Sequence, residues 1–338
     1  MPVHLNTGVR RLGCQVAANP PRVTVFGAVG CALVWGCSNA TGPANVLTHP
    51  VGTSVQRAVV NDRPYGIAVS NAGLVLASRL DADQLSQLSL SNQTQQRTIA
   101  VGAVPTDVAL SPQGDVAYVA NQFSHGVGVV EVASGQQVAE IPVTGDPFRV
   151  LVSADGMTVY ATSNADKVFV INATTRSVAR SIAVGLDPNG LALSPGGEFL
   201  YVSGQTDGTL AKVNPITGQV VATVTVCGSP QEVVMSPAGD EVYVACLGGG
   251  LEVRRASDLG GITTIAAASE GFGMAMSPDG AQLYVTQTLL GTIAVIGRVS
   301  RSLVTLIEVG GNPRRVRFSK IGETAVVADE NGAVVFIR

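Results

Sequence analysis

One short turn recurs along the 338-residue chain at an almost constant spacing, and this repeat constrains the fold more than any other feature. Residues 111–114 read Ser-Pro-Gln-Gly, the residue preference of a type I β-turn, because Pro presets the backbone angle and Gly relieves the exit. The run 116–120 that follows alternates apolar side chains with the two-residue period of a β-strand. The same turn begins, with Gly three residues later, at Ser70, Ser111, Ser153, Ser194, Ser236, Ser277 and Ser319.

A landmark residue stands six positions before each of these turns. The landmarks are 41 or 42 residues apart, and a fixed period of this size indicates a repeat architecture. Each unit contains four strand-like runs separated by turn residues, which is the content of one propeller blade, and no window carries a sustained helical pattern. The landmarks are Pro64, Pro105, Pro147, Pro188, Pro230, Gly271 and Pro313.

The last unit, 313–338, is too short to hold a fourth strand. Its missing strand has a candidate upstream, because residues 53–64 align with the unit-ending segments 175–188 and 300–313. Pairing that segment into the final blade would close the ring and leave no blade with an unpaired edge where the ends of the chain meet. The sequence therefore predicts an all-β, seven-bladed β-propeller of four-stranded antiparallel blades, closed by an N-terminal strand.

The second strand of five units carries a further signature. It reads YVAN at 118–121, YATS at 160–163, YVSG at 201–204, YVAC at 243–246 and YVTQ at 284–287. Together with the preceding SPxG turns, this pattern resembles the YVTN-type β-propeller repeat family, which includes YncE-like periplasmic proteins, over roughly residues 53–338. The resemblance implies the fold but no single activity, since the repeat occurs in binding proteins, lactonase-like enzymes and domains attached to redox enzymes. Ala77 and Val326 replace the Tyr in the first and last units.

The segment before the repeats has the design of an export signal. Residues 23–35 form an apolar run of thirteen residues that follows Arg10, Arg11 and Arg22 and is shorter than the ~20 residues of a membrane-spanning helix. A small residue precedes Cys37, as in a bacterial lipobox, so we favour lipidation of Cys37. Simple export and a buried segment are the alternatives.

The predicted organisation has three parts: a signal segment 1–37, a flexible tether 38–52 rich in Pro, Gly, Asn and Thr, and the propeller 53–338. We therefore expect an exported, monomeric protein in the periplasm or at the cell surface, held at a membrane only by its lipid anchor. The net charge is −3 and no basic stripe is present, which argues against nucleic acid as a partner.

Charged residues gather at one position of the repeat, two residues after the landmark. The seven units carry there Gly66, Asp107, Arg149, Gly190, Glu232, Gly273 and Arg315. Because loops into the innermost strand open on one face of a propeller, these side chains are expected to meet at a funnel. They would hold a small anionic or zwitterionic ligand through their guanidiniums, with Asn121, Asn189 and Arg314 completing the site. The alternative, which we favour, is that Asp107 and Arg149, on adjacent blades, pair with each other across the mouth of the ring.

Catalytic and metal signatures are weak. Of three histidines, only His125 belongs to a blade, and no cluster of His with carboxylates has metal-ligand spacing. No metal or other cofactor is predicted, although calcium stays open because its oxygen ligands leave no tight signature. A lactonase-like hydrolase would need Glu232 or Asp107 as base, with Arg149 or Arg315 polarising the ester carbonyl.

Two cysteines remain beyond the predicted signal. Cys227 leads into the fifth unit and Cys246 ends its second strand, so the blade register brings them close together. A disulfide is expected in an oxidising compartment, the alternative being two buried thiols.

The function that we favour is a non-catalytic envelope scaffold that binds an envelope protein, a peptide or a glycan at its funnel face. The lactonase-like hydrolase is the runner-up.

Overall fold

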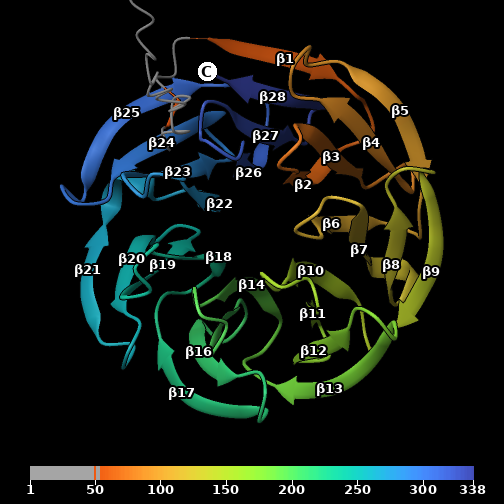
Figure 1. Ribbon diagram of the computed structural model, residues 1–338. Coiled ribbons are helices and arrows are strands. Elements are labelled where there is room, and N and C mark those ends of the chain that lie inside the picture. Colours follow the sequence, from red (N-terminus) through yellow and green to blue (C-terminus); the bar gives the residue numbers. More distant parts are fainter. Residues whose placement is uncertain (1–48, 51–53) are drawn as a thin grey trace, which may run out of the picture. The chain divides into compact units, whose positions relative to one another are not determined.

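A computed structural model of the chain describes residues 49–50 and 54–338, which form a ring of seven four-stranded antiparallel sheets (Figure 1). The predicted seven-bladed propeller is confirmed. The predicted signal segment, Cys37 and most of the tether lie outside the described residues. Within the described part, no helix is long and apolar enough to cross a membrane.

The first four blades run in chain order, each from its inner strand outward. Blade 1 consists of β2 (Pro64–Val69), β3 (Leu74–Arg79), β4 (Gln84–Ser89) and β5 (Gln95–Ala100). Blade 2 consists of β6 (Pro105–Leu110), β7 (Val116–Asn121), β8 (Gly126–Glu131) and β9 (Gln136–Pro142), with the 3-10 turn η1 (Gln122–Ser124) between β7 and β8. Blade 3 consists of β10 (Pro147–Val152), β11 (Thr158–Ser163), β12 (Lys167–Asn172) and β13 (Ser177–Ala183). Blade 4 consists of β14 (Pro188–Leu193), β15 (Leu200–Gly204), β16 (Thr209–Asn214) and β17 (Gln219–Thr225).

The remaining three blades complete the ring. Blade 5 consists of β18 (Pro230–Met235), β19 (Glu241–Cys246), β20 (Gly250–Arg255) and β21 (Gly261–Ile265), followed by the 3-10 turn η2 (Ala266–Ala268). Blade 6 consists of β22 (Gly271–Met276), β23 (Gln282–Gln287), β24 (Thr292–Gly297) and β25 (Ser302–Glu308). Blade 7 joins β26 (Pro313–Phe318), β27 (Ala325–Asp329) and β28 (Ala333–Ile337) to β1 (Val55–Val59), its outermost strand.

Closure of the ring depends on the pairing of β1 with β28. Val55 lies opposite Ile337 and Val59 opposite Ala333, and Ser54 and Arg338 extend the ladder by two further backbone hydrogen bonds of 3.0 and 2.9 Å. Figure 1 shows the two strands side by side although 273 residues separate the end of one from the start of the other. The predicted N-terminal closing strand is therefore confirmed.

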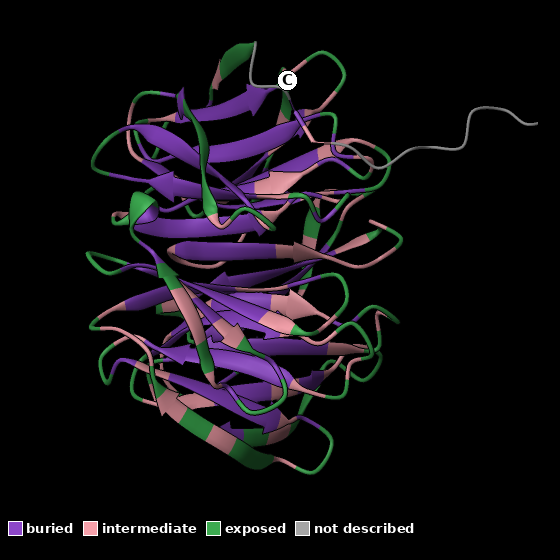
Figure 2. Ribbon diagram, turned by 90° about the vertical axis from the view of Figure 1, so that its left-hand side faces the viewer, coloured by how far each residue is buried: buried purple, intermediate pink, exposed green. Residues whose placement is uncertain are grey.

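The hydrophobic core lies between neighbouring blades. In the cluster between blades 2 and 3, Tyr118 of the YVAN strand packs with Val150 and Phe169 of the next blade. The strands are mostly buried, whereas exposed residues gather in the loops and on the outermost strands (Figure 2). The recurrent Tyr therefore fills a gap between two sheets.

The loops define the two faces of the ring. We call the upper face the one that carries the loops into the inner strands together with the loops between second and third strands. These two sets of loops bond to each other, as when the Leu247 N–H donates to the Ser229 carbonyl. The lower face carries the recurrent Ser-to-Gly turns.

Deleting residues 54–59 should lower the melting temperature of the full chain by roughly 10 °C. The deletion removes about five backbone hydrogen bonds and exposes the edge of β28, at a cost of about 5 kcal/mol. Differential scanning calorimetry measures the change, and a six-residue deletion at 39–44, inside the predicted tether, is the control. Equal melting temperatures for the two deletions would contradict closure by β1.

Candidate functional site

Every inner strand contains a β-bulge at its upper end. In β6, Pro105 lies opposite Asn121 and Asp107 opposite Ala120, so Thr106 is the extra residue. The same shift follows the landmark in all seven inner strands. Because a bulge interrupts the regular alternation of side chains, it re-aims the two residues after the landmark. Side chains at these positions therefore meet across the axis of the ring, as ion pairs between Arg149, Glu232 and Arg315 show.

The second position after the landmark forms a charged layer of Asp107, Arg149, Glu232 and Arg315. The carboxylate of Glu232 binds two guanidiniums: one oxygen accepts from Arg149 and the other from Arg315 at 2.5 Å. Arg149 in turn lies 3.5 Å from Asp107, whose carboxylate also accepts from a backbone N–H of β10 at 3.1 Å. Blades 2, 3, 5 and 7 are thereby linked by ion pairs across the ring.

Amide side chains extend this layer toward blade 4. Arg315 donates to the Asn189 carbonyl oxygen at 3.4 Å, and the Asn189 amide group donates to Gln231 at 2.9 Å and to Gln205 at 3.2 Å. The structure therefore brings together five predicted site residues: Asp107, Arg149, Asn189, Glu232 and Arg315.

Glycine fills the same repeat position in blades 1, 4 and 6 because the next inner strand approaches too closely for a side chain. A Cβ on Gly66 would lie 2.5 Å from the Asp107 Cα, and one on Gly190 would lie 2.7 Å from the Gln231 carbonyl oxygen. On Gly273 it would lie 2.1 Å from the Arg314 carbonyl oxygen. In three blades the backbone of the next inner strand therefore occupies the space that a charged side chain fills in the other four.

An aromatic layer covers the charged layer on its upper side. Tyr65, from the position directly after the landmark, packs edge to face on Phe148 at 6.0 Å and on Phe272 at 5.9 Å between ring centroids. The guanidinium of Arg315 lies 4.9 Å from the centroid of Phe272, a cation–π contact that joins the two layers. The relative exposure is 0% for Arg315, 1% for Asp107, and 2% for Arg149 and Glu232. These charges lie inside the ring and not at an open mouth.

Electrostatics keep Glu232 ionised in this buried position. Burial alone would raise the pKa of its carboxyl, but the positive charges of Arg149 and Arg315 outweigh that effect and lower the pKa below its ordinary value. Burial and the charge of Arg149 lower the pKa of Arg315 to about 10, so both members of the pair are charged at neutral pH. A carboxylate held in this way is a weak base, and both its oxygens are occupied.

Two predicted residues lie outside the charged layer. Arg314 belongs to the aromatic layer: its guanidinium lies 4.7 Å from the Phe272 centroid and binds Glu330 at 2.5 Å. Asn121 is buried within blade 2, where its amide group donates to Glu140 at 3.0 Å.

The His125 imidazole lies 2.8 Å from Asp146 at the upper surface. In the part of the chain that the structure describes, no three His, Cys, Asp or Glu side chains are grouped to hold a metal ion.

Sequence reasoning missed the aromatic layer. Its signal was present one position before the charged residues, where an alignment of the seven units shows three aromatic side chains. In a chain with only 4% aromatic residues, that enrichment indicates that the axis is filled on this side. The position is occupied by Tyr65, Thr106, Phe148, Asn189, Gln231, Phe272 and Arg314.

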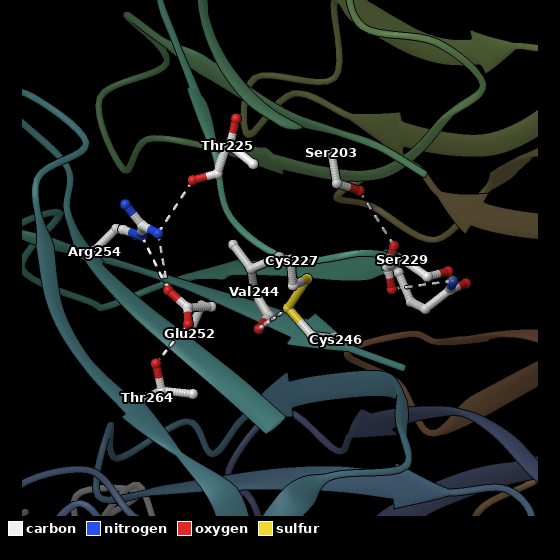
Figure 3. Close-up of a disulfide and its surroundings, with 10 residues drawn as sticks. Ser203, Thr225, Cys227, Ser229, Val244, Cys246, Glu252, Arg254 and Thr264 are labelled. Carbon is white, nitrogen blue, oxygen red and sulfur yellow. Dashed lines mark hydrogen bonds and ion pairs between the residues drawn. A yellow bond between two sulfur atoms is a disulfide. The ribbon is translucent and has the colours of Figure 1, made fainter. Parts of the chain in front are cut away.

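Cys227 and Cys246 form a disulfide, with 6.2 Å between their Cα atoms (Figure 3). It joins the loop before β18 to the end of β19, at the upper face of blade 5. Gly249 packs against it, because a Cβ there would lie 3.1 Å from the Cys246 Cβ. The bond therefore fixes the loops of this blade next to the inner strand that carries Glu232.

Comparisons with known proteins agree with the fold, and the protein is a seven-bladed β-propeller. No protein-family model matches the chain. Over 114 residues it is 37% identical to the seven-bladed beta-propeller protein Rv1057 of Mycobacterium tuberculosis, a segment that is 31% of this chain and only 28% of that relative. Hydrazine synthase of Kuenenia stuttgartiensis has a similar structure, with a TM-score of 0.70 and 21% identity over 83% of this chain and 97% of the other. This second likeness concerns the fold alone.

Replacing Glu232 by Gln should cost about 3–5 kcal/mol of stability at pH 7, because two buried guanidiniums lose their shared carboxylate. The pKa of Glu232 is lower in the folded than in the unfolded chain, so its contribution is complete above the ordinary value of 4.5 and disappears as the pH falls through the lowered value. Urea unfolding from pH 7 to pH 3 measures both effects.

The control for this prediction is Asp258→Asn, which breaks the exposed ion pair with Arg255 and should leave the urea midpoint nearly unchanged. If the Glu232 and Asp258 variants lost equally little stability at pH 7, the charged layer would not be a structural element of the ring.

Removing the disulfide with Cys227→Ser and Cys246→Ser together should lower the free energy of unfolding by ~3 kcal/mol, because the bond closes a loop between residues 19 apart. Urea unfolding of the two proteins measures the loss. Mass spectrometry after alkylation should find both cysteines unmodified until a reductant is added. Alkylation of both without reduction would disprove the bond.

Proposed function

We propose that this protein is a non-catalytic binding scaffold of the cell envelope that takes a protein partner on the upper face of its ring. The observation that carries the proposal is a set of large apolar side chains left exposed in the loops of that face. Exposed large apolar side chains that gather on one face of a soluble protein mark an interaction site. The set consists of Phe123, Leu186, Leu247, Leu289 and Leu290, with relative exposures from 40% to 78%.

Four of these side chains follow one arc of the ring. Leu186 precedes β14 of blade 4, Leu247 follows β19 of blade 5, and Leu289 and Leu290 follow β23 of blade 6. The aromatic layer and Arg314 lie at the axis beside this arc. Aromatic and Arg side chains surrounded by apolar contacts are the composition of protein-binding hot spots. A folded partner or peptide fits this surface better than a small polar ligand.

A lactonase-like hydrolase is the competing proposal, and the site geometry disfavours it. Glu232 and Asp107 would have to accept a proton from a nucleophile within hydrogen-bond reach. Both are almost completely buried beneath the aromatic layer, and the lowered pKa of Glu232 makes it a poor base. The likeness to hydrazine synthase adds no argument for catalysis, because at 21% identity it reflects the fold.

Export is part of the proposal. The apolar run 23–35 and Cys37 support a lipoprotein signal, and the Cys227–Cys246 disulfide supports an oxidising compartment. We propose that the mature protein is anchored to a membrane through lipid on Cys37. Such an anchor would leave the ring free to bind an envelope partner.

Photocrosslinking in the source cells tests the proposal. A photoreactive residue at Leu289 of the full chain should form an adduct with one discrete protein. The same residue at Val299, an exposed apolar position on the lower face, should not. With that partner purified, the double variant Leu289→Ser, Leu290→Ser should bind at least roughly tenfold more weakly.

The matched control is the lower-face double variant Ile216→Ser, Val299→Ser, whose side chains are 75% and 85% exposed and which should bind like the wild type. Equal adducts from both faces, or none from Leu289, would contradict the proposal. So would lactone hydrolysis by the purified protein that disappears in Glu232→Gln.

A further inference from the structure

Arg317 breaks the repeat at the fourth position after the landmark. The other six units carry only apolar residues there, so the inner strand of blade 7 places a cation where its counterparts place small or branched hydrocarbon. The full set is Ala68, Ala109, Leu151, Ala192, Val234, Ala275 and Arg317. The side chain of Arg317 keeps 32% of its surface exposed, whereas Arg149 and Arg315 are enclosed.

A cavity of about 270 Å³ lies beside Arg317 on the lower side of the charged layer. Its walls come from the inner strands β2, β6 and β10 and from the turns that follow β2 and β6, and Arg317 comes from the inner strand β26. These four strands lie around the centre of the ring (Figure 1). The cavity that they line is therefore at the axis, next to the turns of the lower face. We call it the lower cavity.

The lining of the lower cavity is apolar apart from one cation and a few small polar side chains. Val69, Leu110 and Val152 represent the hydrocarbon walls, Ser70 and Ser111 lie at the turns, and no described lining residue is a carboxylate. By contrast, the larger cleft between blades 4 and 5 is lined by three carboxylate residues in addition to the buried Lys212. The lower cavity therefore offers a ligand a positive charge without a carboxylate in the surrounding wall.

The charges at the axis do not cancel once Arg317 is included. Three guanidiniums, those of Arg149, Arg315 and Arg317, face the carboxylates of Asp107 and Glu232, and no other described carboxylate forms an ion pair with them. Arg317 lies 3.6 Å from Glu232, beyond hydrogen-bond distance, and its one hydrogen bond among the described residues goes to the neighbouring Val316 carbonyl. The cluster therefore carries one net positive charge, and the guanidinium that solvent can reach is that of Arg317.

We propose that the lower cavity binds a small organic carboxylate. The carboxylate pairs with the Arg317 guanidinium, which matches its planar, two-oxygen geometry, and the hydrocarbon part lies against the walls formed by β2, β6 and β10. The volume is close to the lower end of ligand pockets, which restricts the ligand to a short chain. This site opens on the lower face, so it is separate from the partner-binding surface proposed for the upper face.

Isothermal titration calorimetry with butyrate tests the site in the wild-type protein and in Arg317→Gln. The expected result is saturable binding to the wild type that weakens at least roughly tenfold in the variant, because a charge-assisted hydrogen bond is lost. Arg255→Gln, at an exposed guanidinium far from the axis, is the control and should bind like the wild type. 1-Butanol, in which an uncharged CH₂OH group replaces the carboxylate on the same propyl chain, should not bind measurably.

A second variant changes the hydrocarbon wall of the lower cavity instead of its cation. Ala109→Leu fills the lower cavity and leaves Arg317 in place, so it should abolish butyrate binding as well. Three outcomes would overturn the proposal: no saturable binding of butyrate to the wild type, unchanged affinity in Arg317→Gln, or chloride binding as tightly as butyrate. The last outcome would indicate a bare anion site with no role for the hydrocarbon walls.

Discussion

The pairing of β1 with β28 is the constraint on which the rest of the structure depends. A propeller blade buries its two faces against its neighbours, so the first and last blades of an unclosed array would each expose one apolar face. The outermost strand of blade 7 is β1, from the start of the chain. Its backbone hydrogen bonds to β28 hold the two ends of the chain together. Closure then brings seven equivalent inner strands to one axis, where side chains from distant parts of the sequence meet.

Along that axis the repeat produces layers, since each position after the landmark contributes one residue from every blade. The first position is rich in aromatic side chains and covers the upper side, the second holds two carboxylates and two guanidiniums, and the fourth is apolar except for Arg317. The charged layer is tolerable inside the ring because its members neutralise each other and Glu232 pairs with two guanidiniums at once. The axis therefore combines an upper side covered by aromatic side chains with a lower cavity that carries a single cation.

The sequence predicted the fold well because the period, the turn and the strand pattern repeat seven times. A unit that departs from the pattern can therefore be aligned with the others. The turn at Ser111, the landmark prolines and the similarity of 53–64 to later unit ends were sufficient for blade number and closure. The candidate site was predicted only in part. The meeting of Asp107, Arg149, Glu232 and Arg315 followed from equal repeat positions, whereas their burial did not.

The charged residues are buried because aromatic side chains fill the space above them, and this depends on packing in three dimensions. Tyr65, Phe148 and Phe272 come from blades 1, 3 and 6, so nothing in their local sequences indicates that they touch. Asn121 illustrates the same limit: it shares a loop region with the axis residues, but its side chain turns toward Glu140 of its own blade. Repeat position fixes which residues approach the axis, and side-chain packing decides which of them solvent can reach.

Amide hydrogen exchange of the intact chain tests closure most directly. In a closed ring β28 has a paired strand on each side, so the amides of residues 333–337 should exchange as slowly as those of 292–297 in β24, the equivalent strand of blade 6. The outermost strand β25, residues 302–308, sets the rate for a strand paired on one side only. Exchange of residues 333–337 at that faster rate would show that β28 is an open edge and would contradict a ring closed by β1.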